Sequence, residues 1–278
     1  MTAFLYLCNI LCASGQSAFG KQYARSGGKA AVFNINKALV GAVLFLFCGL
    51  LKKFSFHLPT AALGIGYGVG LCCSMHTGFQ ALSIGPMALT SMIASFSLII
   101  PFLFGICFWN ETLTAFKAVG ILLLMVSIWL INAEKGSKFS VKWLLYAAST
   151  LLANGVCSVV QKLHQIHFPT LYRAEFMFWA MVSVLVILFI MRTGRKGKAD
   201  PFRFSLLGMV SGVLNCAANY IVLYLSATEN ASVLFPVISV ANIMAVWIIG
   251  VFFFKERLKG IQMMGLIVGV ASVVLLKL

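Results

Sequence analysis

The chain contains 278 residues, of which 61% are hydrophobic and only 10% are charged. Soluble domains carry about 25% charged residues, so this composition excludes an ordinary soluble globular protein. The 21 lysines and arginines outnumber the 6 acidic residues and give a formal net charge of +15. They lie in short clusters between apolar runs, which excludes a basic nucleic-acid-binding tail and is typical of loop charges that orient a membrane protein.

Apolar runs divide the chain into ten segments that are long enough to cross a membrane as helices, since a crossing needs about 20 mostly apolar residues. The charge-free stretch from Phe54 to Asn110 is too long for one crossing, and the turn residues Ser83-Ile84-Gly85-Pro86 divide it. The first segment lacks a basic leader and a small-residue cleavage site, so we expect a retained helix rather than a signal peptide. The predicted helices are residues 2–20, 31–51, 59–82, 87–109, 114–132, 143–161, 172–191, 204–227, 231–254 and 260–276.

The eight cysteines all lie inside apolar segments, and none forms a C-x-x-C pair. Isolated cysteines in apolar runs are typical of small packing residues rather than of metal ligands or redox pairs. We therefore expect no disulfide, no metal and no cofactor.

The second half of the chain repeats features of the first half at a nearly constant offset. The run from Phe108 to Leu113, with Glu111 inside it, returns as the run from Phe253 to Leu258, with Glu256 at the matching position. Leu63-Gly64 and Gly68-Val69 likewise return as Leu207-Gly208 and Gly212-Val213. The sequence predicts a duplicated five-helix unit, residues 1–137 and 138–278. Because five is odd, the second unit enters the membrane from the opposite side, and such inverted repeats are typical of secondary transporters.

On these motifs the chain resembles the EamA-like family of the drug/metabolite transporter superfamily. Each half has an F-x-x-E-x-L turn between its fourth and fifth helices and a glycine seven residues beyond the leucine, Gly120 and Gly265. The resemblance covers the whole chain and implies an all-α polytopic protein with ten transmembrane helices around a central cavity. It also implies alternating access, export of amino acids or related metabolites, and a place in the plasma or inner cell membrane. The family's usual arginine near the start of the second helix is Lys37 here.

Polar residues at helical spacing indicate which segments face the cavity, because buried polar groups in a membrane are costly and usually face a wet interior. The sixth segment carries a continuous stripe of Thr150, Asn154, Ser158 and Gln161. By this criterion segments 1, 3, 4, 6, 8 and 9 line the cavity, while segments 5 and 10 lie outside. The predicted substrate-binding residues are Gln16, His76, Gln80, Ser91, Asn154, Ser158, Asn215, Asn219, Tyr220 and Asn242.

Several of these residues also have structural interpretations. A single serine or threonine more often joins two helices through a hydrogen bond than binds a substrate. His76 is either a proton carrier or substrate donor, or a hydrogen-bonded structural histidine. Lys37 is expected to snorkel toward the membrane surface. Glu111 and Glu256 are expected to sit against helix N-termini. The aromatic residues proposed for the cavity wall are Phe79, Phe96, Tyr220, Tyr224 and Trp247.

All six acidic residues fall in loops or near helix ends, so no carboxylate lies at mid-membrane. A substrate that is neutral, zwitterionic or anionic is therefore expected, with a small molecule and membrane lipid as partners, no nucleic acid, and a monomer or homodimer. An enzyme is not expected, because no nucleophile–base pair or metal motif lies at membrane depth. A passive channel and a structural membrane protein are the remaining alternatives, and an intramembrane enzyme is the weakest.

The orientation of the chain is open, because two arguments disagree. The family has cytoplasmic termini. The loops on the side of the termini, however, carry six basic residues against fourteen on the opposite side, and the positive-inside rule then puts the termini outside. The six are Lys52, Lys53, Lys117, Lys162, Arg173 and Lys277.

Overall fold

A computed structural model describes residues 2–51, 53–108, 114–132, 140–168, 171–193, 204–228, 231–256 and 260–275. In these ranges the chain is entirely helical apart from turns and short connections. The helices are α1 (Thr2–Arg25), α2 (Ala30–Leu51), α3 (Leu58–Ile84), α4 (Met87–Ser95), the 3-10 turn η1 (Phe96–Leu98), α5 (Ile99–Phe108), α6 (Ala115–Asn132), α7 (Val141–His167), α8 (Arg173–Thr193), α9 (Leu206–Thr228), α10 (Ala231–Phe252) and α11 (Gly260–Leu275).

Each of the ten segments predicted from the apolar runs coincides with one helix, except that residues 87–109 form the broken run α4–η1–α5. Pro101 explains the break. Proline has no N–H to donate to the carbonyl four residues earlier, which is that of Ser97 inside η1. The break is short, since the 3-10 turn spans three residues.

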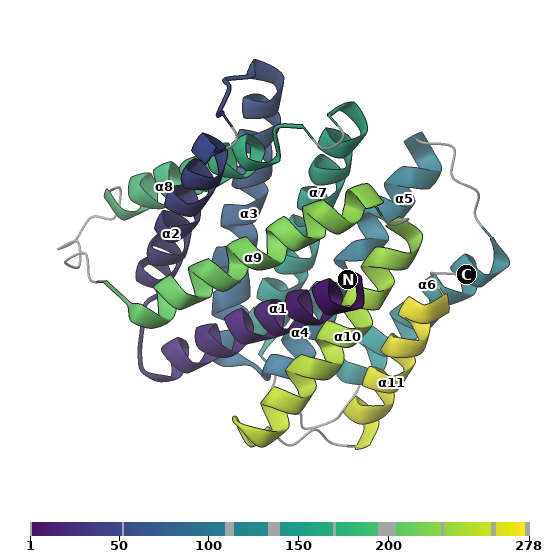
Figure 1. Ribbon diagram of the computed structural model, residues 1–278. Helices are drawn as coiled ribbons and strands as arrows, with labels where there is room; N and C mark the ends of the chain where they lie inside the picture. Colours follow the sequence, from purple (N-terminus) through teal and green to yellow (C-terminus); the bar gives the residue numbers. More distant parts are fainter. Residues whose placement is uncertain are drawn as a thin grey trace.

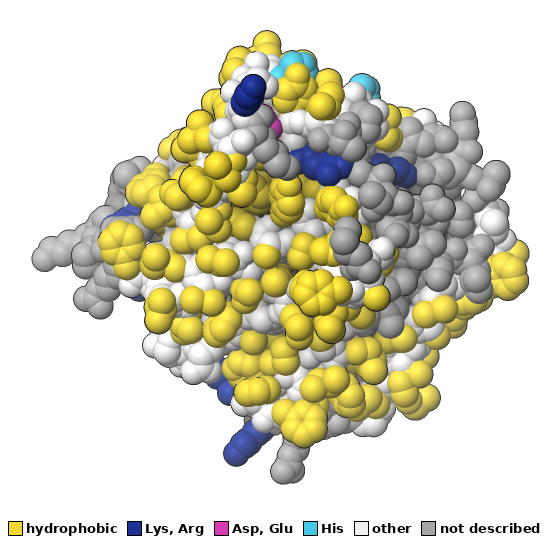
Figure 2. Space-filling view, viewed as in Figure 1, with side chains coloured by type: hydrophobic (Ala, Val, Ile, Leu, Met, Phe, Trp, Pro, Cys, Tyr) yellow, Lys and Arg dark blue, Asp and Glu magenta, His cyan; other side chains and the backbone are white. Residues whose placement is uncertain are grey.

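The surface of the bundle is suited to lipid. Among the residues that the structure describes, five helices are long and apolar enough to cross a membrane: α2, α3, α7, α8 and α9. Large apolar side chains such as Leu51, Phe47 and Trp129 are more than half exposed. Figure 2 shows that apolar side chains cover the middle of one face, whereas most of its visible lysines and arginines lie toward the upper and lower ends. This surface supports a membrane-embedded protein, because burial in lipid is the ordinary explanation for so extensive an apolar exterior.

The helices pair across the two halves of the chain. α3 packs against α7 and α8, and its counterpart in the second half, α9, packs against α1 and α2. α2 also packs against α8. α6 and α11 lie side by side at one edge of the bundle (Figure 1), away from the cavity described below.

Glycines allow two of these crossings to be close. A Cβ added to Gly64 or Gly68 of α3 would lie 2.8 Å from Phe176 O or 2.5 Å from Ala180 O of α8. On α9, a Cβ at Gly212 would lie 2.8 Å from Lys37 O of α2. These distances are too short for any side chain, so these glycines allow the helices to approach closely. Gly66 of the same helix has no such role, because it is exposed and an added Cβ there would have nothing within 4 Å.

The α6–α11 pair is joined by two reciprocal hydrogen bonds. Ser127 Oγ of α6 donates to Gly265 O of α11 at 2.6 Å, and Ser272 Oγ of α11 donates to Gly120 O of α6 at 2.8 Å. Ser127 and Ser272 occupy matching positions in the repeated sequence, as do Gly120 and Gly265. Each half of the chain therefore makes the same contact to the other half.

Candidate functional site: a polar cavity between six helical segments

A cavity of about 370 Å³ lies at the centre of the bundle. Pockets that hold small organic molecules have volumes of about 300–1,000 Å³, so this cavity fits a metabolite of modest size. It is lined by α1, α2, α3, the α4–η1 run, α7 and α9. Its polar lining residues are Gln16, Ser17, Asn34, Lys37, Tyr67, Ser74, Thr90, Ser91, Ser97, Thr150, Asn154, Ser158, Gln161, Asn215 and Asn219.

Six of the ten residues predicted to bind substrate line this cavity. They come from α1, α4, α7 and α9, and they are Gln16, Ser91, Asn154, Ser158, Asn215 and Asn219. The whole polar stripe of α7 faces the cavity, including Thr150 and Gln161. The helical spacing of polar residues thus identified one wall correctly.

The structure places the other four predicted residues outside the cavity lining. His76 and Gln80 lie on α3 beside the lining residues Met75 and Phe79, but each is one position further around the helix. Since one residue corresponds to about 100° of rotation, they face a different neighbour. Tyr220 follows Asn219 and packs on the apolar cluster that α2, α3 and α8 form with residues of α7 and α9.

Asn242 lies on α10, and no described residue of that helix lines the cavity. The predicted set of lining segments therefore needs one correction: α2, the second segment, lines the cavity, and the ninth segment does not contribute from its described residues. Of the proposed aromatic wall residues, Phe79 lines the cavity, together with Phe33 and Tyr67. Phe96 is fully buried in an apolar cluster instead, and neither Tyr224 nor Trp247 is a lining residue.

Several lining amides and hydroxyls hold helices together. Ser74 Oγ of α3 donates to Asn154 Oδ1 of α7, and Thr77 and Thr150 share a hydrogen bond of 2.8 Å between the same helices. Tyr67 OH donates to Asn219 Oδ1 of α9 at 3.3 Å. Asn219 also donates its amide nitrogen to Asn215 O at 2.8 Å. Asn154 and Asn219 therefore have structural partners as well as a place in the cavity wall.

Lys37 lies in the cavity wall and does not snorkel. Its ammonium group donates to Gln16 Oε1 of α1 at 2.8 Å. The expected path toward the membrane surface is wrong because a lining amide of the neighbouring helix offers a hydrogen bond nearby. The lysine therefore carries a positive charge into the polar interior.

Three further lining amides have nitrogen atoms without a hydrogen-bond partner in the protein. They are Asn34 Nδ2, Asn215 Nδ2 and Gln161 Nε2. The exposed fractions of these residues are 1%, 5% and 9%. Buried N–H donors are almost always paired in folded proteins, so an unpaired set that faces a cavity indicates groups available to a ligand.

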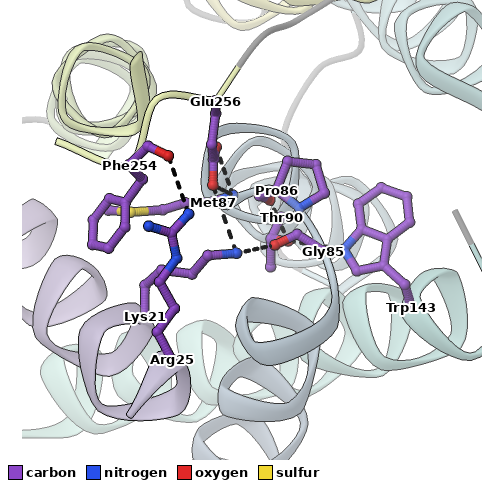
Figure 3. Close-up of polar contacts among 9 residues, drawn as sticks. All are labelled: Lys21, Arg25, Gly85, Pro86, Met87, Thr90, Trp143, Phe254 and Glu256. Atoms are coloured by element: carbon purple, nitrogen blue, oxygen red, sulfur yellow. Dashed lines mark hydrogen bonds and ion pairs between the residues drawn. The ribbon is translucent and has the colours of Figure 1, made fainter. Parts of the chain in front are cut away.

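A network of charged and polar groups joins several helices at one end of the bundle (Figure 3). Lys21, near the end of α1, lies 3.6 Å from Glu256 Oε1 and donates to Gly85 O in the α3–α4 turn. Both carboxylate oxygens of Glu256 accept from the N–H of Met87 at the start of α4, at 2.8 and 2.9 Å. The expected place of Glu256 at a helix N-terminus is thus confirmed, although the helix is α4 rather than the one that follows it in sequence. Glu111 lies outside the described residues.

Neighbouring contacts reinforce this end. Arg25 donates to Phe254 O at 3.0 Å, and its guanidinium carbon lies 4.7 Å from the centre of the Phe254 ring. Trp143 of α7 donates its indole N–H to Thr90 Oγ1 at 2.9 Å. Together these contacts join α1, α4, α7 and the segment after α10.

Sequence reasoning missed two central residues, Asn34 and Lys37. Both lie on α2, three positions apart and therefore on one helix face. A polar pair at this spacing inside an otherwise apolar run is the same signal that identified the stripe of α7. The pattern of α2 is harder to recognise, because it has two polar residues where α7 has four. Lys37 by itself is also compatible with snorkelling.

No family model matches the chain, and no curated protein does. Among solved structures, 27 chains match it. One of them, a crystal structure described only as that of a protein, superposes with a TM-score of 0.64 at 14% identity, over 99% of this chain and 95% of its own. At this identity the likeness shows the fold alone.

Proposed function

We propose that the chain is a secondary transporter that moves small organic metabolites by alternating access. The observation that carries the proposal is a polar cavity of about 370 Å³ lined by six helical segments inside a bundle with an apolar exterior. Polar residues at membrane depth are costly and are retained where a substrate or ion passes. The charges around Lys21 and Glu256 at one end provide a contact that must open for a substrate to pass in that direction.

The proposed architecture is ten transmembrane helices in two inverted five-helix repeats, residues 1–137 and 138–278. It is supported by contacts that recur when the halves are exchanged. Gly68 meets Ala180 of α8 as Gly212 meets Lys37 of α2, and the bonds of Ser127 and Ser272 are likewise reciprocal. In transporters built this way the substrate site lies between the repeats, where this cavity lies.

We further propose that the chain is an EamA-like member of the drug/metabolite transporter superfamily, in the plasma or inner cell membrane. The sequence motifs carry this assignment, and the whole-chain superposition on a solved structure is compatible with it. Exchange or export of amino acids or related metabolites is the corresponding expectation. If the positive-inside rule holds, the Lys21–Glu256 end faces the cytoplasm.

A passive channel and a structural membrane protein remain the competing functions, and an enzyme is disfavoured. The Lys21–Glu256 network argues against a permanently open pore, since it ties α1 to the α3–α4 turn. Among the described residues no cluster of three His, Cys, Asp or Glu side chains offers a metal-binding centre.

The test is counterflow in proteoliposomes that contain the purified protein. Vesicles are loaded with a millimolar pool of one amino acid or organic acid, and uptake of the same labelled compound is followed. A carrier gives transient accumulation that saturates, whereas a channel gives equilibration without saturation and a scaffold gives none.

A matched pair of variants assigns the flux to this cavity. Ala94→Phe adds an aromatic ring to the cavity wall, whereas Ala62→Phe adds the same ring to the exposed face of α3. We expect at least tenfold slower exchange for Ala94→Phe and unchanged exchange for Ala62→Phe. Equal rates in both variants would place the pathway elsewhere.

A further inference from the structure

The charged and hydrogen-bonding groups of the cavity are unbalanced. The described lining residues include one lysine and no aspartate or glutamate. The two acidic side chains that the structure describes are engaged elsewhere: Glu175 accepts from the backbone N–H of Ser55, and Glu256 binds Lys21 and Met87. Within the described part of the chain, Lys37 therefore has no carboxylate to neutralise it.

The contact between Lys37 and Gln16 satisfies only part of the ammonium group. An ammonium has three N–H donors, and the amide oxygen of Gln16 accepts one of them at 2.8 Å without supplying a negative charge. Lys37 is only partly exposed, and a charge that is partly withdrawn from water is disfavoured unless an opposite charge or several polar groups compensate it. Among the described residues no negative charge compensates Lys37, and an anionic ligand would supply one.

The unpaired amide N–H groups of the cavity also need an acceptor, which a carboxylate would supply. Asn34 lies one helical turn before Lys37 on α2, and its Nδ2 has no acceptor. Asn215 Nδ2 on α9 and Gln161 Nε2 on α7 also have none, and all three side chains line the cavity. Three helices thus contribute unpaired N–H donors to the lining of the cavity that also contains Lys37, and a carboxylate has several lone-pair positions to accept them.

From this arrangement we infer that the cavity binds an organic anion, with the carboxylate of the ligand at Lys37 and its oxygens accepting from the amide groups of Asn34, Asn215 and Gln161. That this ligand is the transported substrate rests on the proposed transport function, whereas its binding in the cavity does not. The inference narrows the substrate class to organic acids and amino acids that keep a free carboxylate. Molecules with only a positive charge are excluded by repulsion from Lys37.

Binding is tested by thermal stabilisation of the purified protein in detergent. The probes are a panel of monocarboxylates, dicarboxylates and amino acids, each paired with its primary amide, so that members of a pair differ little in size. Hydrogen bonds to charged groups are stronger than neutral ones, and we expect the best acid to bind about 10-fold to 100-fold more tightly than its amide. Chloride and inorganic phosphate are measured in parallel.

Variants assign the preference to Lys37. Lys37→Gln is expected to remove at least 90% of the preference for the acid over the amide, while Lys37→Arg retains a preference. Lys142→Gln makes the same change at an exposed lysine of α7 and should leave binding unaltered. Without ligand, Lys37→Gln should melt at the same temperature as the parent protein or a few degrees higher, because it removes an uncompensated charge.

Three results would overturn the inference: equal binding of acids and their amides, stabilisation by chloride or phosphate as strong as by the best acid, or no acid in the panel that stabilises the protein. A loss of binding in Lys37→Gln that only follows a loss of folded protein would also overturn it.

The counterflow assay with the same probes separates this inference from the transport proposal. If acids bind through Lys37 but do not exchange across the vesicle membrane, the anion site is supported and the transport proposal is contradicted. If acids and their amides exchange at equal rates, the transport proposal is supported and the anion site is contradicted.

Discussion

The Lys21–Glu256 network and the central cavity each contain a lysine from the first two helices, yet the two lysines differ in their partners. Lys21 has a carboxylate 3.6 Å away and a backbone carbonyl. Lys37 has one neutral amide. The difference separates two uses of a charge inside the bundle: a charge that the protein neutralises holds elements together, whereas we infer that one without an opposite charge attracts an anionic ligand.

Two asparagines of α2 repeat the contrast. Asn36 donates to Val32 O at 2.8 Å and accepts from the N–H of Ser205 at 3.2 Å, which ties α2 to the start of α9. Asn34, two positions earlier, has an amide nitrogen without a partner and lines the cavity. Residue type alone does not distinguish these roles, whereas the hydrogen-bond partners do.

We expect the largest loss of stability when Lys21 is replaced. Lys21→Met leaves the Glu256 carboxylate in a site where both side chains are only 9% exposed. Breaking a buried ion pair costs about 3–5 kcal/mol, and we expect the lower end because the Met87 N–H still donates to both oxygens of Glu256. Unfolding of the purified protein in mixed micelles measures the loss. The double variant Lys21→Met with Glu256→Gln should regain part of it, and a double variant less stable than the single one would contradict the assignment.

A second test asks whether the cavity wall is held by packing directly behind it. Gly68 is adjacent to the lining residue Tyr67, and its backbone lies against Ala180 of α8. Gly68→Val should lower the free energy of unfolding toward the upper end of the usual range for overpacking, about 1–3 kcal/mol. Gly66→Val, two positions away on the exposed face, is the matched control and should retain the melting temperature. Similar losses in both variants would mean that helix propensity, not the α3–α8 contact, is responsible.

The smallest expected changes in stability concern the two asparagines, Asn34 and Asn36. Asn36→Ala removes hydrogen bonds that the fold uses and should cost about 1 kcal/mol in the free energy of unfolding. Asn34→Ala removes a group without a partner and should change that free energy little, while it weakens binding of the best organic acid. Denaturation and ligand titration of the same two preparations give both quantities. The reverse pattern would assign Asn34 to the fold and Asn36 to the site.

Local sequence properties predicted much of the fold. Apolar runs of about 20 residues gave the helical segments, because the length of a hydrophobic run and the position of turn residues are properties of a short stretch of chain. The stripe of α7 was predicted for the same reason, since four polar residues at helical spacing define one face regardless of what packs there. The sequence also indicates a bend in the fourth segment, because Pro101 leaves a backbone carbonyl without its helical donor, but it does not predict the 3-10 turn at Phe96–Leu98.

Only the tertiary structure decided which helices and which polar groups form the cavity. His76, Gln80 and Asn242 look in sequence like the residues that do line it, and they differ only in the rotation and neighbours of their helices. The bond from Lys37 to Gln16 joins residues 21 positions apart, and that from Tyr67 to Asn219 joins residues 152 apart. The sequence by itself determined a helical membrane protein with polar residues to place, since hydrophobicity is local. Whether each polar group is satisfied or left open depends on partners from other helices, and for that reason it was settled by packing.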